Sequence, residues 1–313
     1  MDMVYPDYFD DFRCIAHKCR HNCCIGWEID IDKDSLDYYL SVEGEFGNKL
    51  RDRISLEGEP HFILKSDDRC PFLDSCNLCE IFSILGENKL CQICSDHPRF
   101  YNLTEHHTEA GLGLCCEEAA RIILTKESPT FLKGASYQST GILSLRDKCI
   151  DTMQNRSQSI PQRLSDMLGL FGIENYEYNF DNVLTLFEKL ERLDDKWSNL
   201  LCLVKSDYKS ADREGFANHM KKRTTEYEQL ICYLIYRHMP KAEFLEDAAS
   251  YGLFSALVYR LLYTMGEVIF TCTGNFSVED QIELARLFSS EIEYSDENID
   301  LILDFLYTET SDN

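Results

Sequence analysis

The chain has 313 residues and a formal net charge of −24, and it is 44% hydrophobic and 12% aromatic. This length suits one large domain or two ordinary ones with a substantial core, and the composition excludes a disordered chain. The negative charge disfavours nucleic acid, whose phosphates would be repelled, and favours a basic protein or a lysine-bearing substrate. Plain solubility explains the same charge.

The amino-terminal sequence, MDMVYPDYFDDFRC, is acidic and interrupted by Pro6. It therefore lacks the basic start and apolar run of a secretory signal. No stretch reaches the roughly 18 consecutive apolar residues that are typical of a membrane-spanning helix. The run LICYLIY at 230–236 is short, and we expect it in the buried core. These observations predict a cytoplasmic protein without a membrane partner.

Short elements of mixed type are predicted for the first part of the chain. Alternating polarity predicts strands, and apolar residues at helical spacing predict helices. Asp32 or Asp34 is expected to cap the first helix, Gly86 to end the second, and Cys116 to lie at the start of the third. We expect strands over 26–32 and 61–65 and helices over 35–42 and 80–86. Within 111–126 we expect an extended, glycine-bearing segment that runs into a helix starting near Cys116.

From residue 162 onward the pattern becomes helical. Ser277 with Asp280, and Ser295 with Asn298, have the spacing of amino-terminal caps. We expect helices over 163–171, 182–204, 213–240, 243–272, 277–293 and 295–309. The predicted fold class is mainly α. A small mixed α/β cysteine-rich metal-binding domain (1–126), a connector (127–161) and an all-α helical domain for substrate docking (162–313) are expected in this order.

The cysteines are distributed very unevenly, since eleven of the 15 lie within the first 116 residues. In a reducing cytoplasm disulfides would not persist, so clustered thiols favour metal binding. Thiolates are soft ligands that select zinc, copper(I) or iron–sulfur clusters. The four remaining cysteines stand singly on apolar helices and are expected to be small buried hydrophobic residues. They are Cys149, Cys202, Cys232 and Cys272.

Zinc and iron–sulfur clusters are both compatible with parts of the pattern. CNLC at 76–79 and CQIC at 91–94 resemble two zinc knuckles, but they leave seven of the clustered cysteines unexplained. Iron–sulfur clusters take four thiolates from less rigid spacings. The CxxxCxxC motif of radical S-adenosylmethionine enzymes begins at Cys19 and Cys23 but fails at Gly26.

Three motifs occur in a fixed order: FRC-x4-C-x3-CC-x-GW (12–27), CPFL…LCEIFSILGENKL…C-x2-HPR (70–99) and L-x-C-x-EAAR (114–121). This set resembles the flagellin lysine-N-methylase family (FliB). It also shares features with the YkgJ-type cysteine-cluster proteins. The motifs cover roughly residues 12–125, and the helical half is similar to the family in a less specific way.

The resemblance implies S-adenosylmethionine-dependent methylation of lysine side chains of flagellin. It also implies an iron–sulfur cluster, expected to be 4Fe–4S, with zinc as the alternative. Cys76, Cys91 and Cys115 fall outside the family pattern, as do Glu117, in place of the usual proline, and His97, in place of an aromatic residue. The metal ligands implied by the resemblance are Cys14, Cys19, Cys23, Cys24, Cys70, Cys79, Cys94 and Cys116.

The sequence leaves the catalytic base and the methyl-donor site unassigned, since it contains no glycine-rich strand–turn–helix motif. Acidic and tyrosine side chains of the helical half are expected to receive the target lysine. Core and groove packing at helical spacing is the favoured explanation of the tyrosines, which are Tyr227, Tyr233, Tyr236, Tyr251, Tyr259 and Tyr263. The alternative function is a non-catalytic protein with a structural zinc or redox-sensing iron–sulfur site and a helical docking module.

Overall fold

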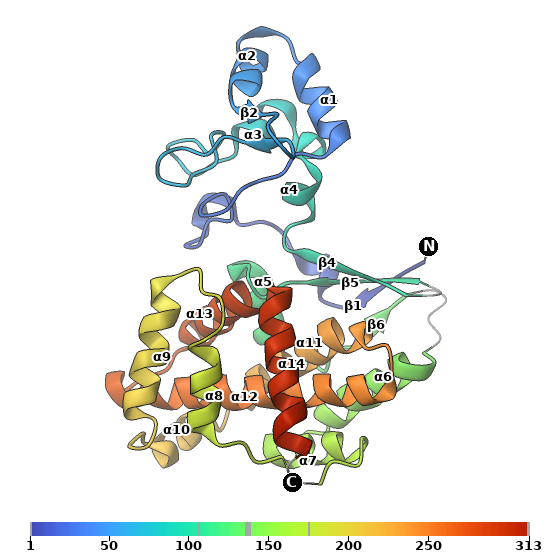
Figure 1. Ribbon diagram of the computed structural model, residues 1–313, viewed down its shortest axis with the longest axis vertical. Helices are drawn as coiled ribbons and strands as arrows, with labels where there is room; N and C mark the ends of the chain where they lie inside the picture. The colour runs from blue at the N-terminus through green and yellow to red at the C-terminus, as the bar shows by residue number, and fades with distance from the viewer. Residues whose placement is uncertain (1, 105–106, 135–138, 175, 312–313) are drawn as a thin grey trace. The chain divides into compact units, whose positions relative to one another are not determined.

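The computed structural model describes residues 2–104, 107–134, 139–174 and 176–311. Helices account for 58% and strands for 9%, which confirms a mainly α protein (Figure 1). The chain forms two compact units. The smaller unit is Arg13–Phe100, and the larger unit combines Met1–Phe12 with Tyr101–Asn313.

This division differs from the predicted domains because the amino terminus joins a sheet of the larger unit. Strand β1 pairs in parallel with β5, with Met3 opposite Thr108, and β6 pairs with the other edge of β1. The sheet order is β4-β5-β1-β6. The strands are β1 (Asp2–Pro6), β4 (Arg99–Leu103), β5 (His107–Leu112) and β6 (Leu132–Lys133).

The smaller unit is built from short helices around an aromatic core. Asp32 caps the first helix through the backbone N–H of Ser35, as predicted, and Gly86 ends the third helix with a φ of 98°. The ring of Phe62 packs edge-on against Phe72 at 5.0 Å. The elements are η2 (Ala16–Lys18), α1 (Lys33–Ser41), α2 (Gly44–Asp52), β2 (Ile54–Ser55), β3 (His61–Phe62), α3 (Glu80–Leu85), η3 (Glu87–Lys89) and α4 (Gln92–Asp96).

The two strands predicted for this unit are wrong or shortened. Residues 26–32 form no strand, because only the isolated bridges Ile25–Arg69 and Asp30–His61 lie near them. The predicted strand at 61–65 is limited to β3, which pairs with the equally short β2. The alternating polarity of these segments reflects which side chains face the core. It does not produce strands, because no continuous partner strand lies beside them.

The larger unit is a helical assembly centred on two apolar helices, α11 and α12. Residues Glu226–His238 of α11 are all buried. Figure 1 shows α14, in red, lying across α12, in orange, and the two helices pack together. The helices are η1 (Phe9–Asp11), α5 (Glu117–Leu124), α6 (Gly141–Met153), α7 (Ile160–Gly169), α8 (Phe180–Phe187), α9 (Asp195–Asp207), α10 (Arg213–Met220), α11 (Thr224–His238), η4 (Met239–Lys241), α12 (Leu245–Thr273), α13 (Val278–Phe288), the π-helix η5 (Ser289–Glu293) and α14 (Asp296–Ser311).

Helix α12 is long and apolar enough to cross a membrane, with a mean hydropathy of 1.4 in its most apolar window. Within the residues that the structure describes, 72% of that window is buried. Its composition is therefore explained by its place in the core, where α10, α11 and α14 pack against it.

The predicted helix over 182–204 is wrong in one respect, because it is divided into α8 and α9. Asp194 begins α9 by accepting a hydrogen bond from the Lys196 N–H. In the break, the N–H of Glu191 donates to Asn298 and that of Leu193 donates to Glu291. Tertiary partners thus replace the helical hydrogen bonds of this segment. The predicted helix over 213–240 is likewise divided, into α10 and α11.

Candidate functional site

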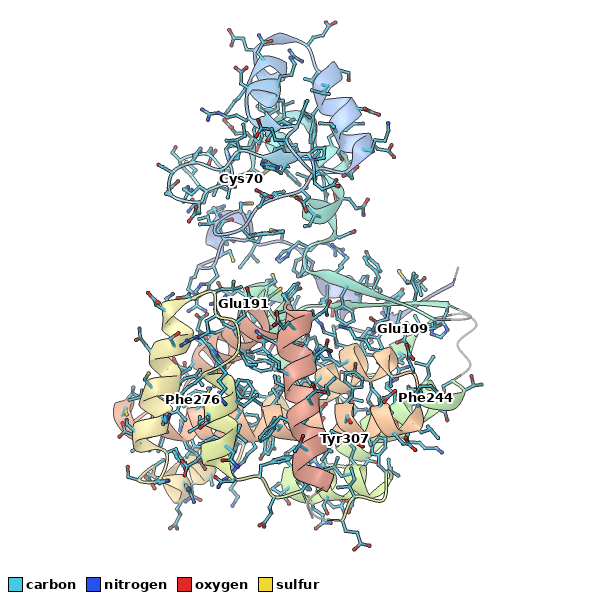
Figure 2. All side chains as sticks on the ribbon, viewed as in Figure 1. Cys70, Glu109, Glu191, Phe244, Phe276 and Tyr307 are labelled. Carbon is cyan, nitrogen blue, oxygen red and sulfur yellow. The ribbon has the colours of Figure 1, made fainter. Side chains whose placement is uncertain are left out.

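Five thiols of the smaller unit pack around one hydrophobic core. Cys70 and Cys91 are buried in it, with exposed fractions of 5% and 1%, and three more cysteines contact it while partly buried. Figure 2 marks Cys70 within this unit. These thiols come from three separate segments of the chain, and they are Cys24, Cys70, Cys79, Cys91 and Cys94.

Backbone hydrogen bonds bring these three segments together. The N–H of Cys70 donates to the carbonyl of Cys24 at 2.8 Å, which aligns the first and second segments. The N–H of Glu80 donates to Phe72 at 2.8 Å, next to the bridge between Leu73 and Cys79. The cysteines are therefore brought together by hydrogen bonds between loop backbones. Regular helices and strands contribute little to their arrangement.

The segment that carries Cys91 and Cys94 is fixed by Asp32. One carboxylate oxygen accepts from Ser35 of α1 at 2.9 Å, and the other accepts from the Gln92 N–H at the start of α4 at 2.7 Å. The Tyr39 hydroxyl donates to the carbonyl of Lys89 at 2.7 Å. The contacts of Asp32 with Gln92 and of Tyr39 with Lys89 connect the α1 region to the 89–92 segment. They fix the position of the CQIC motif against the core.

Cys91 is the functional candidate that the family pattern missed, since that pattern counts only Cys94 of the CQIC motif. The side chains of Cys91 and Cys94 hydrogen-bond to each other, which lowers the pKa of Cys91 and raises that of Cys94. Burial raises the pKa of Cys70 to about 11. Cys91 belongs in the candidate ligand set because its thiol is buried in the same core as that of Cys70 and is paired with Cys94. The CxxC spacing was the signal for it.

The other predicted ligands lie outside this group. Cys14 and Cys23 are exposed, and Cys19 is half-buried, with its thiol donating to the carbonyl of His21 at 3.0 Å. Cys23 and Cys24 hydrogen-bond through their side chains, which raises the pKa of Cys23. Cys116 caps helix α5 in the larger unit, as expected from the sequence.

The donor chemistry fits a soft metal, because five thiols pack around this core. Across residues 2–104 and the other described ranges, no three cysteine, histidine, aspartate or glutamate side chains are arranged to hold a metal ion. The eight-cysteine ligand set thus stays a prediction.

A buried polar network occupies the larger unit next to Cys116. Glu293, at the end of the π-helix, accepts from the Tyr233 hydroxyl at 3.1 Å and lies 2.6 Å from Nε2 of His238. Arg237 donates to the Tyr233 hydroxyl at 2.6 Å and lies over the ring of Tyr294. π-helical segments occur frequently at functional sites.

The network reaches the cysteine segment through two further contacts. The Leu114 N–H donates to the Tyr233 hydroxyl at 3.3 Å, and the Cys115 thiol donates to the Tyr294 hydroxyl at 3.0 Å. Both residues directly precede Cys116. The network therefore anchors the predicted ligand Cys116 to α11 and to the π-helix.

Glu293 carries a full negative charge in this network. Burial alone would raise its pKa, but Arg237 and the hydrogen bond from His238 more than offset this and hold the pKa at about 2. Burial lowers the pKa of His238, so the imidazole is neutral and its Nε2–H donates to the carboxylate. The opposite nitrogen, Nδ1, is then a buried acceptor with no hydrogen-bond partner among the residues that the structure describes.

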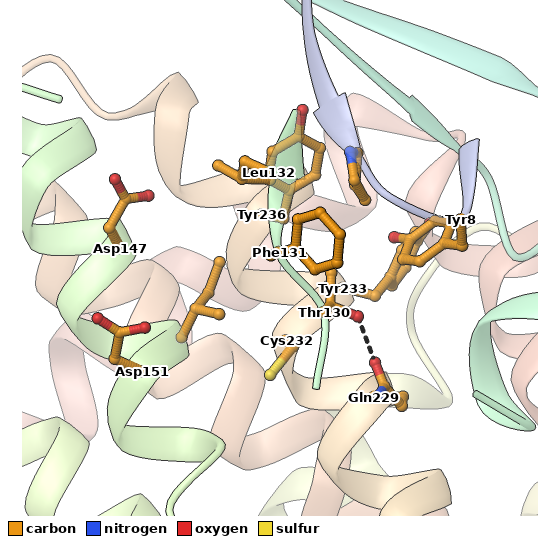
Figure 3. A pocket seen from close by; sticks show the side chains of 12 residues that line it. Tyr8, Thr130, Phe131, Leu132, Asp147, Asp151, Gln229, Cys232, Tyr233 and Tyr236 are labelled. Atoms are coloured by element: carbon orange, nitrogen blue, oxygen red, sulfur yellow. Dashed lines mark hydrogen bonds between the residues drawn. The ribbon is translucent and has the colours of Figure 1, made fainter. Parts of the chain in front are cut away.

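A cavity of about 280 Å³ lies beside the network in the larger unit (Figure 3). One side is the face of α11 that carries Gln229, Cys232, Tyr233 and Tyr236, which is a spacing of three and four residues along the helix. Helix α6 forms the facing side, and the segment 130–132 closes a third. Two of the six tyrosines considered above thus line a cavity.

Three other members of that tyrosine set pack against one another, with Tyr227 buried and the other two half-buried. Tyr227, Tyr259 and Tyr263 form a cluster in which the rings of Tyr227 and Tyr259 lie 5.4 Å apart, edge to face. The isolated cysteines also divide: Cys149 and Cys232 are buried as predicted, whereas Cys202 and Cys272 are exposed. Those two predictions are wrong because both residues lie on the outward faces of their helices.

The FliB lysine N-methylase C-terminal domain matches residues 170–313, from the end of α7 through α14. Proteins named lysine-N-methylase from Salmonella typhimurium and Salmonella choleraesuis are each 30% identical over 126 residues, which is 38% of this chain. The helical second half therefore resembles the FliB lysine N-methylase family.

The alignment spans 31% of the length of these two FliB-family relatives. A third relative, named flagellar biosynthetic protein FliU, from Salmonella muenchen, is 29% identical over 126 residues, covering 38% of this chain and 75% of its own length. No solved structure matches the chain.

Proposed function

We propose that this protein methylates lysine side chains of flagellin with S-adenosylmethionine as methyl donor, in the cytoplasm. The observation that carries the proposal is the family relationship, since relatives at 30% identity are named lysine-N-methylase. The name of the FliU relative, a flagellar biosynthetic protein, supports flagellin as the substrate. The net charge of −24 attracts a lysine-bearing surface.

The reaction requires the target lysine as a neutral amine, although its ordinary pKa is near 10.4. The nitrogen electron pair forms the new N–CH3 bond, the sulfonium–CH3 bond breaks with its electrons on sulfur, and the amine proton passes to solvent. Exclusion of water around the nitrogen favours the neutral amine, because burial disfavours the charged form.

An iron–sulfur cluster held by thiols of the smaller unit is the second part of the proposal. When bound, such a cluster supplies redox or Lewis-acid chemistry. Five thiols share one core, and we assign the ligand role to four of them, Cys70, Cys79, Cys91 and Cys94. The loops that carry these cysteines have few helical or sheet hydrogen bonds. A bound metal would therefore also stabilise the arrangement of the cysteine segments.

A structural zinc site is the second candidate. It is favoured by the side-chain hydrogen bond between Cys91 and Cys94, because a paired CxxC is typical of zinc knuckles. Cys76 of the other CxxC motif is exposed while Cys79 contacts the core, so CQIC is the CxxC motif with both thiols at this core.

Two experiments test these proposals. Flagellin co-expressed with the protein is digested and examined by mass spectrometry; methylated lysines that depend on the protein are expected, and their absence refutes the methylation function. The protein is then reconstituted anaerobically with iron and sulfide and analysed for metal content and absorption. A Cys70/Cys79/Cys91/Cys94→Ser variant should lose metal and methylation, and full methylation by this variant contradicts a role for the cluster. A Cys202/Cys272→Ser variant is the matched control.

A further inference from the structure

The walls of the cavity in the larger unit are held in place before any ligand binds. The Tyr236 hydroxyl donates to the carbonyls of Val4 and Ala110 at 3.1 and 3.0 Å. Gln229 accepts from the Thr130 hydroxyl at 2.8 Å, as Figure 3 shows. These hydrogen bonds already order the side chains, so ligand binding would not have to supply the free energy of ordering them. The cavity is therefore preorganised.

The lining combines aromatic rings with carboxylates. Tyr8, Phe131, Tyr233 and Tyr236 supply rings, and α6 supplies Asp147 together with the carboxylate one helical turn later. None of the described residues that line the cavity is basic. Aromatic faces and carboxylates both attract cations, and this combination is typical of sites for ammonium groups.

The charge on the α6 side is negative in excess. Arg146 is shared by two carboxylates, since it pairs with buried Glu109 at 2.9 Å and with Asp147 at 2.7 Å. Asp151, at the mouth of the cavity, adds a third. Burial and the neighbouring Asp147 raise the pKa of Asp151, and a cation placed nearby would reverse this effect.

The size of the cavity limits what can enter it. Its volume of about 280 Å³ lies just below the roughly 300–1,000 Å³ of pockets that enclose drug-sized ligands. A whole S-adenosylmethionine molecule would therefore be only partly enclosed, whereas one long side chain fits. Phe131, which lines the cavity, is 60% exposed and is therefore accessible to a side chain from another protein.

We infer that this cavity binds the ε-ammonium group and the aliphatic stem of a lysine side chain from a protein substrate. The inference rests on the proposed function and assigns the residues that recognise its substrate. The methylene stem would contact the rings of Tyr8, Phe131 and Tyr236, and the ammonium would face Asp147 and Asp151. Because carboxylates favour the charged amine, this cavity serves recognition of lysine and not its deprotonation.

The test is a binding measurement on the full chain. The probe is Nα-acetyl-L-lysine-N-methylamide, followed by saturation-transfer NMR and by titration, and the matched probe is the norleucine analogue, which lacks the ammonium. We expect saturation of the lysine δ and ε methylenes, weaker binding at higher salt, and no comparable binding of the norleucine analogue. Equal binding of both probes, or no binding of the lysine probe, overturns the inference.

Variants locate the binding. Asp147→Asn/Asp151→Asn should weaken binding of the lysine probe at least tenfold, and Phe131→Ala should weaken it severalfold. Asp300→Asn/Asp304→Asn is the matched control, since both residues are exposed and share the four-residue spacing on α14. Asp151→Asn alone, at an exposed position, serves if the double variant unfolds. Unchanged binding by a folded cavity variant overturns the inference.

Methylation of flagellin, measured in parallel, separates this inference from the proposed function. Wild-type protein that methylates flagellin but does not bind the lysine probe refutes only the cavity assignment. Protein that binds the probe through Asp151 and Phe131 but never methylates flagellin supports the cavity and refutes the methyltransferase function.

Discussion

Replacement of Glu293 by glutamine tests the buried network of the larger unit. The Glu293 side chain is fully buried and holds Arg237, Tyr233 and His238. The variant leaves the Arg237 charge without its carboxylate, and removal of one partner of a buried pair typically costs about 3–5 kcal/mol. A pKa of about 2 against an ordinary 4.5 corresponds independently to about 3 kcal/mol. We expect a loss of about 3 kcal/mol in the free energy of unfolding at pH 7.

The loss should depend on pH in a defined direction. The pKa of Glu293 is lowered by folding, so its contribution is complete above pH 4.5 and disappears as the pH falls to about 2. At pH 3 more than half of the contribution should be gone, and the variant and wild type should differ by only about 1 kcal/mol. A gap of about 3 kcal/mol at both pH values would refute the charged state of Glu293.

Urea unfolding followed by the fluorescence of Trp197 measures this effect in the larger unit. Trp197 is completely buried there, and a Trp27→Phe background removes the other tryptophan of the chain. Glu297→Gln, at an exposed position of α14, is the matched control and should change the unfolding free energy by less than about 0.5 kcal/mol. A loss below about 1 kcal/mol for Glu293→Gln at pH 7 would show that the network contributes little.

Three further predictions address the thiols, a helix contact and a helix cap. Cys91→Ser should reduce the bound iron or zinc measured by elemental analysis, whereas Cys76→Ser should not; equal losses contradict the ligand assignment. Gly266→Ala should lower the free energy of unfolding by about 1 kcal/mol or more, because its Cβ would lie 2.7 Å from a phenylalanine ring of α10. Gly169→Ala, with open space around it, should be neutral or slightly stabilising in the same urea titration. Ser277→Ala removes the capping box of α13 and should cost about 1 kcal/mol; no change in urea unfolding contradicts this.

Local signals predicted the helices of the second half well. Ser277 and Ser295 begin α13 and α14 as expected, because each hydroxyl accepts from a backbone N–H three residues later. The break between α8 and α9 could not be predicted in this way. Apolar spacing continues through the break, and the contacts that replace its helical hydrogen bonds come from Asn298 and Glu291, which are distant in the sequence.

The unit boundaries were hidden for a similar reason. The parallel pairing of β1 with β5 brings Met3 beside Thr108, and neither segment carries a pattern that names its partner. Cysteine density suggested one domain through residue 126, yet Cys116 follows β5 into the larger unit. Composition identified the chemistry of the thiols, whereas strand pairing decided which thiols share a unit.

The candidate sites show where sequence reasoning ends. The spacing of Gln229, Cys232, Tyr233 and Tyr236 marks one face of a helix, and such a face packs in a core or lines a cavity with equal ease. The choice is made by α6, which supplies carboxylates opposite this face. That helix lies in the segment predicted as a partly helical connector, where weak periodicity gave no bounds for it. The acidic and aromatic groups expected to receive lysine therefore meet through packing, because one side of the cavity carries a strong local signal and the other does not.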